Sequence, residues 1–209
     1  SGTYAVGGLT SAIGTGDSLG LFGGWALIIT YEHSSKPFRR LMVFNASSAL
    51  QVTNGNPASA TVSGLLTPPA GNFNAYMGAL VWEGDDGING DQFNLSGAGV
   101  QNGGNLSDAQ SPVNNFWNSR ISRLGSLFTN RNPAYANNFA IDLKLVDISN
   151  VPANTGPRMA NSGTTANLQF TSTGDVYFPH ALVFISDLYS PNLLPSLNKT
   201  VANVSRPGA

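Results

Sequence analysis

The residues best suited to chemistry lie in an acidic loop at positions 83–91, which reads Glu-Gly-Asp-Asp-Gly-Ile-Asn-Gly-Asp. Hard divalent cations take several oxygen ligands, and a tightly turning loop can supply them. Glycines at positions 84, 87 and 90 permit such turns. We expect calcium rather than magnesium, because a flexible loop can offer many ligands. The predicted ligands are four carboxylates and one amide: Glu83, Asp85, Asp86, Asn89 and Asp91.

A simpler interpretation of this loop stays open. Its spacing does not match the EF-hand, which needs a glutamate at the twelfth position. Asp-Gly and Asn-Gly steps are also ordinary turn formers, and Glu83 could simply end the strand before it. A second, weaker acidic site involves Asp17, Asp108 or Asp175, each of which is otherwise a turn or cap residue.

Residues for catalysis are scarce. The only histidines are His33 and His180, and the sequence has no Gly-x-Ser-x-Gly elbow to present a nucleophilic serine. The only glutamates, Glu32 and Glu83, both fall at predicted strand ends and would be the pair to test for glycoside cleavage. We therefore expect no enzymatic activity.

The three tryptophans are candidates for stacking against a sugar ring. Trp25 and Trp82 lie in apolar segments, so we expect both in the core. Trp117 lies in an asparagine-rich stretch, 114–118, and is the predicted ligand-binding residue.

Composition narrows the class of protein. Only 10% of the 209 residues are charged, against about 25% in an average soluble protein. The net charge of −1 gives no field to attract a polyanion, so we expect no nucleic-acid partner. No apolar run approaches the length of about 18 residues that spans a bilayer, so we expect no membrane insertion. The absence of cysteine together with few Lys and Glu residues suits a bacterial surface protein.

The clearest elements are β-strands. Residues 24–32 and 38–45 are rich in β-branched and aromatic residues around a turn at 33–37, which predicts a hairpin. Its first strand is apolar on both faces, as in a covered sheet. A strict alternation over 139–145 predicts a half-buried strand, with Phe139, Ile141, Leu143 and Leu145 facing inward and Asp142 and Lys144 outward.

Further strands are expected at 3–6, 49–53, 60–65, 73–82, 92–95, 120–122, 126–128, 164–172 and 175–189. About ten strands without a convincing helix predict an all-β fold, an antiparallel β-sandwich of jelly-roll type with long loops. The predicted sandwich domain spans 1–191. Residues 192–209 are expected to form a linker and a C-terminal extension strand.

Several segments in this order resemble the N-terminal head region of large bacterial surface proteins, which precedes tandem immunoglobulin-like repeats. They are 24–32 with 38–41, 83–91, 131–135, and 174–179 with 187–191. Residues 197–201 with 206–208 resemble the first strand of such a repeat. The resemblance implies a surface location and an adhesin or envelope role, and it supplies no catalytic residues.

Some bacterial surface domains are stabilised by a covalent bond between a lysine and an asparagine. The only lysines here are Lys36, Lys144 and Lys199, all beside polar or turn residues. Because Lys144 is expected to point outward, we do not expect such a bond.

The sequence thus predicts a non-enzymatic, extracellular domain of a cell-surface protein that acts in adhesion or in building an envelope or filament structure. Its expected partner is a neighbouring domain or subunit, reached by strand addition through residues 196–204, where Leu197, Lys199 and Val201 alternate. The alternative is a calcium-dependent carbohydrate-binding module with glycans as ligands.

Overall fold

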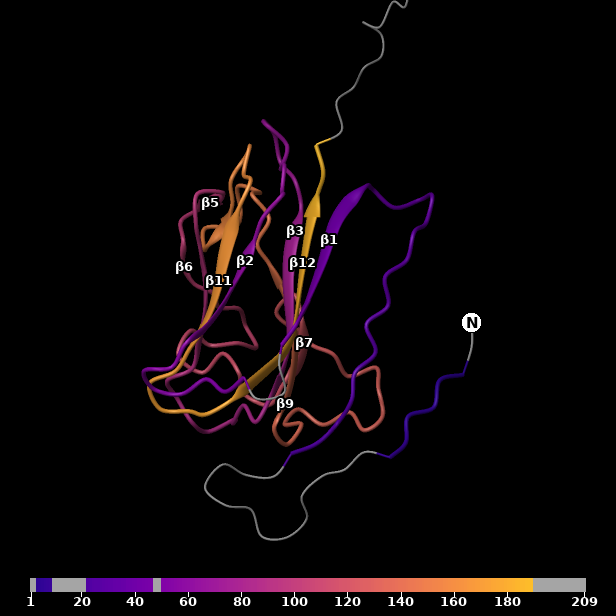
Figure 1. The fold of residues 1–209 in the computed structure, drawn as a ribbon, viewed down its shortest axis with the longest axis vertical. Helices are drawn as coiled ribbons and strands as arrows, with labels where there is room; N and C mark the ends of the chain where they lie inside the picture. The colour runs from indigo at the N-terminus through magenta and orange to yellow at the C-terminus, as the bar shows by residue number, and fades with distance from the viewer. Residues whose placement is uncertain (1–2, 9–21, 47–49, 190–209) are drawn as a thin grey trace, which may run out of the picture.

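Two β-sheets packed face to face form the body of the protein (Figure 1). The computed structural model describes residues 3–8, 22–46 and 50–189. The predicted C-terminal strand, with Leu197, Lys199 and Val201, lies outside these ranges, as does Asp17.

The first sheet has six strands in the order β1 (Arg39–Asn45), β12 (Phe178–Asp187), β3 (Ala75–Trp82), β9 (Ile141–Asp147), β7 (Ile121–Arg123) and β8 (Ser126–Leu127). The second has four, in the order β2 (Ala58–Val62), β11 (Ala166–Thr171), β4 (Gln92–Ser96) and β6 (Gly104–Asn105). A separate pair joins β10 (Arg158–Met159) to β5 (Val100–Gln101). Of the paired strands described, only β7 and β9 run parallel.

The predicted all-β class is confirmed, and the described residues contain no helix. None of them therefore forms a helix with the length and apolarity that crossing a membrane needs. The expected strands at 73–82, 92–95, 164–172 and 175–189 correspond to β3, β4, β11 and β12. The jelly-roll order of the strands stays a prediction.

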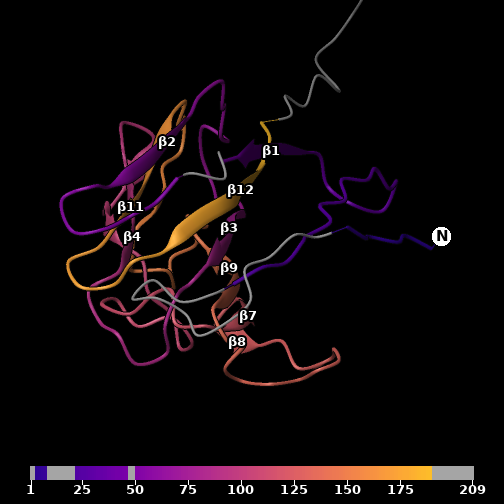
Figure 2. The same ribbon diagram turned by 60° about the horizontal axis from the view of Figure 1, so that its bottom comes forward.

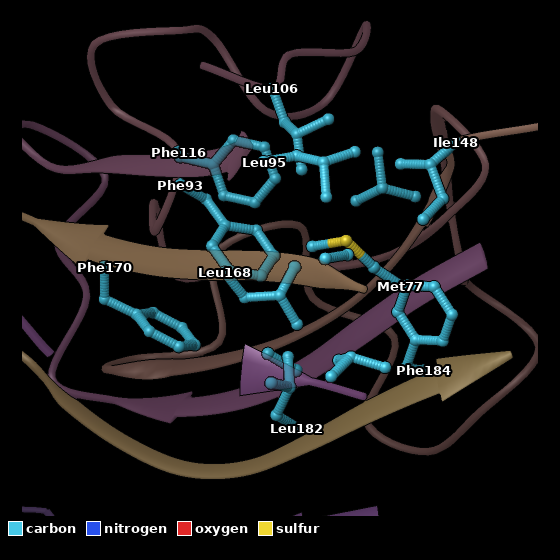
Figure 3. Packing of buried hydrophobic residues seen from close by; sticks show 14 of the residues in the cluster. Met77, Phe93, Leu95, Leu106, Phe116, Ile148, Leu168, Phe170, Leu182 and Phe184 are labelled. Carbon is cyan, nitrogen blue, oxygen red and sulfur yellow. The ribbon is translucent and has the colours of Figure 1, made fainter. Parts of the chain in front are cut away.

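The main core fills the space between the two sheets. Along β3, every second side chain enters it, and Ala75, Met77 and Val81 are fully buried. Figure 3 shows side chains of both sheets meeting in this layer: Met77, Phe93, Leu168, Phe170, Leu182 and Phe184. Burial of these apolar surfaces supplies the main force that holds the two sheets together.

The predicted hairpin is correct in its second half only. Residues 38–45 supply β1, whereas 24–32 form no strand and 3–6 form none either. Residues 22–32 lie on the side of the six-stranded sheet that faces away from the four-stranded one (Figure 2). There Phe22 packs on Trp82 and Phe178, while residues 26–28 border a cavity of about 350 Å³ over the sheet's outer face. The side chains of residues 24–32 are nevertheless exposed, and the segment forms no ladder with β1.

Strand β9 has its two faces reversed relative to the prediction. Asp142 and Lys144 point into the protein with 0% and 2% of their surface exposed, whereas Leu143 is 47% exposed on the outer face. The inward orientation is tolerated because the Asp142 carboxylate accepts backbone hydrogen bonds from Ser119 and Arg120. Leu143 instead borders the outer cavity.

Candidate metal centre

The acidic loop begins where β3 ends, at Glu83. This residue adopts a left-handed backbone conformation, with φ of 71°, that turns the chain away from the sheet. Its N–H donates to the carbonyl of Ala140 at 2.7 Å, and the hydroxyl of Ser119 donates to the carbonyl of Gly84 at 2.5 Å. The first residues of the loop are therefore held firmly against the body of the sandwich.

Asp175 lies in the turn between β11 and β12. The hydroxyl of Ser172 donates to its carbonyl at 2.5 Å, and the N–H of Val176 donates to its Oδ1 at 2.7 Å. The side chain is buried, with 3% of the residue exposed; its Oδ2 makes no hydrogen bond of normal geometry, although the backbone of Asp85 lies close enough to lower the pKa of the carboxyl group. A buried carboxylate oxygen without a partner is costly, so this atom calls for a ligand.

Glycines allow the acidic loop and this turn to approach each other. The N–H of Thr173 donates to the carbonyl of Gly90 at 3.0 Å. A Cβ at Gly90, where φ is 123°, would lie 2.6 Å from the nitrogen of Gly174, and one at Gly174 would lie 2.5 Å from the carbonyl oxygen of Asn89. Only glycine fits such a backbone contact.

This approach gathers three carboxylates. One oxygen from each of Glu83, Asp85 and Asp175 lies within 4.8 Å of the other two. Glu83 and Asp175 are buried and Asp85 is half-buried. Oxygen ligands from two loops at such separations form an arrangement that can hold a divalent cation.

Burial and mutual repulsion raise the pKa of two carboxyl groups in this cluster. Burial, followed by the charges of Asp85 and Asp175, raises the pKa of Glu83 to about 8. Burial also raises the pKa of Asp175 to about 7, with a further contribution from the charge of Asp85. Carboxylates gathered away from water resist ionisation unless a positive charge joins them.

The predicted ligand set is therefore only partly brought together. Glu83 and Asp85 belong to the cluster, whereas Asp86 forms an ion pair with Arg120, at 3.2 Å between Oδ1 and Nη2. Asn89 is exposed. Asp91 is fully buried, accepts a hydrogen bond from the N–H of Trp117 through Oδ2, and has no partner for Oδ1.

Asp175 takes the place of the missing ligands. In the sequence it was one of three residues in the weaker acidic group, and the structure separates it from Asp108, whose Oδ1 accepts from the N–H of Gln110. Nothing in the spacing of the acidic loop points to a residue so far along the chain. The Gly-Asp step just before a strand is the one signal for it.

Two of the three tryptophan predictions are wrong. Trp117 is fully buried among Phe93, Phe116 and Phe170, so it cannot present a surface to a ligand. Trp25, expected in the core, is 52% exposed because its segment does not join a sheet. Trp82 is buried as expected.

Comparison with protein-family models, curated proteins and solved structures finds no match to this chain.

Proposed function

We propose that this protein is a non-enzymatic, extracellular domain of a cell-surface protein that binds calcium at Glu83, Asp85 and Asp175 and acts in adhesion or assembly. The observation that carries the metal site is the buried Asp175 Oδ2, which lacks a partner within the carboxylate cluster. A cation there would bind the acidic loop to the turn that precedes β12.

The irregular set of donors favours calcium over magnesium. Two oxygens on opposite sides of a calcium ion are about 4.6–5.2 Å apart, and about 4.0–4.2 Å apart across magnesium. Ligand atoms within 4.8 Å of one another lie inside the calcium span, and this upper bound alone does not separate the two ions. Calcium also accepts an irregular set of carboxylate, carbonyl and water ligands, which suits donors from two different loops.

The surface role rests on composition and resemblance. Few charged residues, no cysteine and the order of segments that resembles bacterial head domains all support it. The carbohydrate-binding alternative loses its main support, because Trp117 belongs to the core. Strand addition through residues 196–204 is the proposed route to a neighbouring subunit. Deleting those residues and measuring particle mass by light scattering tests this route, which unchanged assembly would rule out.

The calcium site is tested by calorimetric titration of chelator-treated protein and by melting curves with calcium or chelator. We expect saturable binding of one ion and a higher melting temperature with calcium, both lost in Asp175→Asn. Glu32→Gln is the control, because it neutralises a carboxylate in an exposed segment that forms no strand. Identical melting curves with and without calcium in the unmodified protein would refute the site.

A further inference from the structure

The side chain of Lys144 is buried beside an asparagine. Only 2% of the lysine is exposed, and its Nζ lies 2.5 Å from Oδ1 of Asn118. Nζ also contacts the hydroxyl of Ser111 at 3.2 Å, the carbonyl of Gln110 at 3.5 Å and the ring of Phe116, whose centroid is 5.6 Å away. A lysine so removed from water is rare and requires an explanation.

The amide of Asn118 is held in a fixed orientation. Its Nδ2 donates to the carbonyl of Gln110 at 3.0 Å, which leaves Oδ1 and the carbonyl carbon on the side of the lysine. The oxygen and nitrogen within one amide group are about 2.2–2.3 Å apart, from standard bond lengths. The lysine nitrogen is therefore nearly as close to Oδ1 as it would be within a shared amide group.

A carboxyl group completes the cluster. Asp142 is fully buried, and its Oδ1 lies 3.4 Å from Nζ of Lys144. Burial raises the pKa of Asp142 and lowers the pKa of Lys144, against their mutual attraction. Both shifts favour a neutral amine beside a neutral acid, the forms that a nucleophile and a proton donor need.

We propose that Lys144 and Asn118 become joined by a covalent amide bond between Nζ and Cγ, with Asp142 transferring the proton. The lone pair of Nζ attacks Cγ of Asn118, so the Nζ–Cγ bond forms and the Cγ–Nδ2 bond breaks. Nδ2 leaves as ammonia, taking the proton that Nζ loses through Asp142, which returns to its starting state. Neither oxidant nor reductant is required.

The fold lowers the activation barrier of this reaction by holding the two groups together. Fixed contact between reactants replaces an encounter in solution and contributes a large part of the barrier reduction in intramolecular chemistry. The bond would join the loop between β6 and β7 to β9, a central strand of the six-stranded sheet. In a chain without cysteine, it would serve as a crosslink that does not depend on redox conditions.

The decisive measurement is the intact mass of the purified, denatured protein. We expect a mass below that of the sequence by one ammonia, about 17 Da. Trypsin should fail to cut after the acylated Lys144, so peptides 41–120 and 132–158 should appear as one linked species. Fragmentation should place the link at Asn118 and Lys144.

The variants Lys144→Met, Asn118→Ala and Asp142→Ala should each show the full sequence mass, and Asp142→Ala retains both bonding partners. Lys36→Arg, which changes an exposed lysine, should keep the ammonia deficit. The wild-type mass decides the question even if a variant fails to fold. A full sequence mass after prolonged incubation would overturn the proposal, as would a loss of water, about 18 Da, that links Lys144 to Asp142.

Discussion

Gly84 and Asp142 touch so closely that a Cβ on the glycine would lie 2.3 Å from Oδ2 of the aspartate. The same Cβ would lie 2.4 Å from the carbonyl oxygen of Trp117. This contact joins the acidic loop to the buried cluster of Asp142, Lys144 and Asn118. The acidic cluster and the lysine cluster are therefore in contact with each other, although their residues come from distant parts of the sequence.

Because no side chain fits at this contact, Gly84→Ala should destabilise the fold. We expect a loss of about 1–3 kcal/mol in the free energy of unfolding, as for other substitutions that overpack a buried position. Denaturant unfolding measures it. Gly87→Ala is the matched control, since a Cβ there meets nothing within 4 Å and should change stability by less than about 0.5 kcal/mol. Equal effects of the two substitutions would contradict the packing described.

Trp117 and Trp25 should differ sharply when truncated. Trp117→Ala removes a fully buried indole from the aromatic cluster and should cost about 3–5 kcal/mol. Trp25→Ala removes a half-exposed ring and should cost about 1 kcal/mol or less. Urea unfolding of both variants distinguishes this arrangement from the one that the sequence pattern predicted, which would reverse the order.

The orientation of β9 can be tested with two alanine substitutions on opposite faces. Val146→Ala removes fewer atoms than Leu143→Ala, yet Val146 is 3% exposed and Leu143 47%. In denaturant unfolding we expect the free energy of unfolding to fall by about 2–3 kcal/mol for Val146→Ala and by about 1 kcal/mol for Leu143→Ala. A larger loss from Leu143→Ala would mean that the apolar face of the strand points inward after all.

Without metal, stability should fall as the pH rises from about 4 to about 8. The folded state raises the pKa of Glu83 from 4.5 to about 8 and of Asp175 from 3.8 to about 7. In this window the folded protein binds more protons than the unfolded chain, so each pH unit upward favours unfolding. Denaturant unfolding in chelator across this range measures the slope, and Glu83→Gln should flatten it. A slope of the opposite sign would show that the carboxylates are already paired with positive charge.

The affinity for calcium should rise with pH, because the carboxyl ligands must lose their protons before they bind the ion. We expect affinity to be weak near pH 5 and to rise until Glu83 is ionised, at about pH 8. At pH 7 binding should release protons. Calorimetry in buffers of different ionisation enthalpy measures that release, and an enthalpy independent of the buffer would contradict it.

The pattern of side chains predicted most of the sandwich. Alternation in β3 placed Met77 and Val81 in the core, and turn residues bounded β4 and β11 near their observed ends. Local propensity suffices where one face of a strand is buried and the other side needs no special partner. For residues 24–32 it failed: their side chains are exposed, and the segment passes the outer face of a sheet without pairing into it.

By itself, the sequence determined the class of fold and two of the three residues of the acidic cluster, Glu83 and Asp85. Tertiary structure alone decided that Asp175 joins them and that Lys144 turns inward to Asn118. The physical reason is that the cost of burying a charge depends on its partners, and these partners come from loops far apart in the chain. A polar residue on an alternating strand therefore indicates the outer face only until the fold brings other polar groups to meet it.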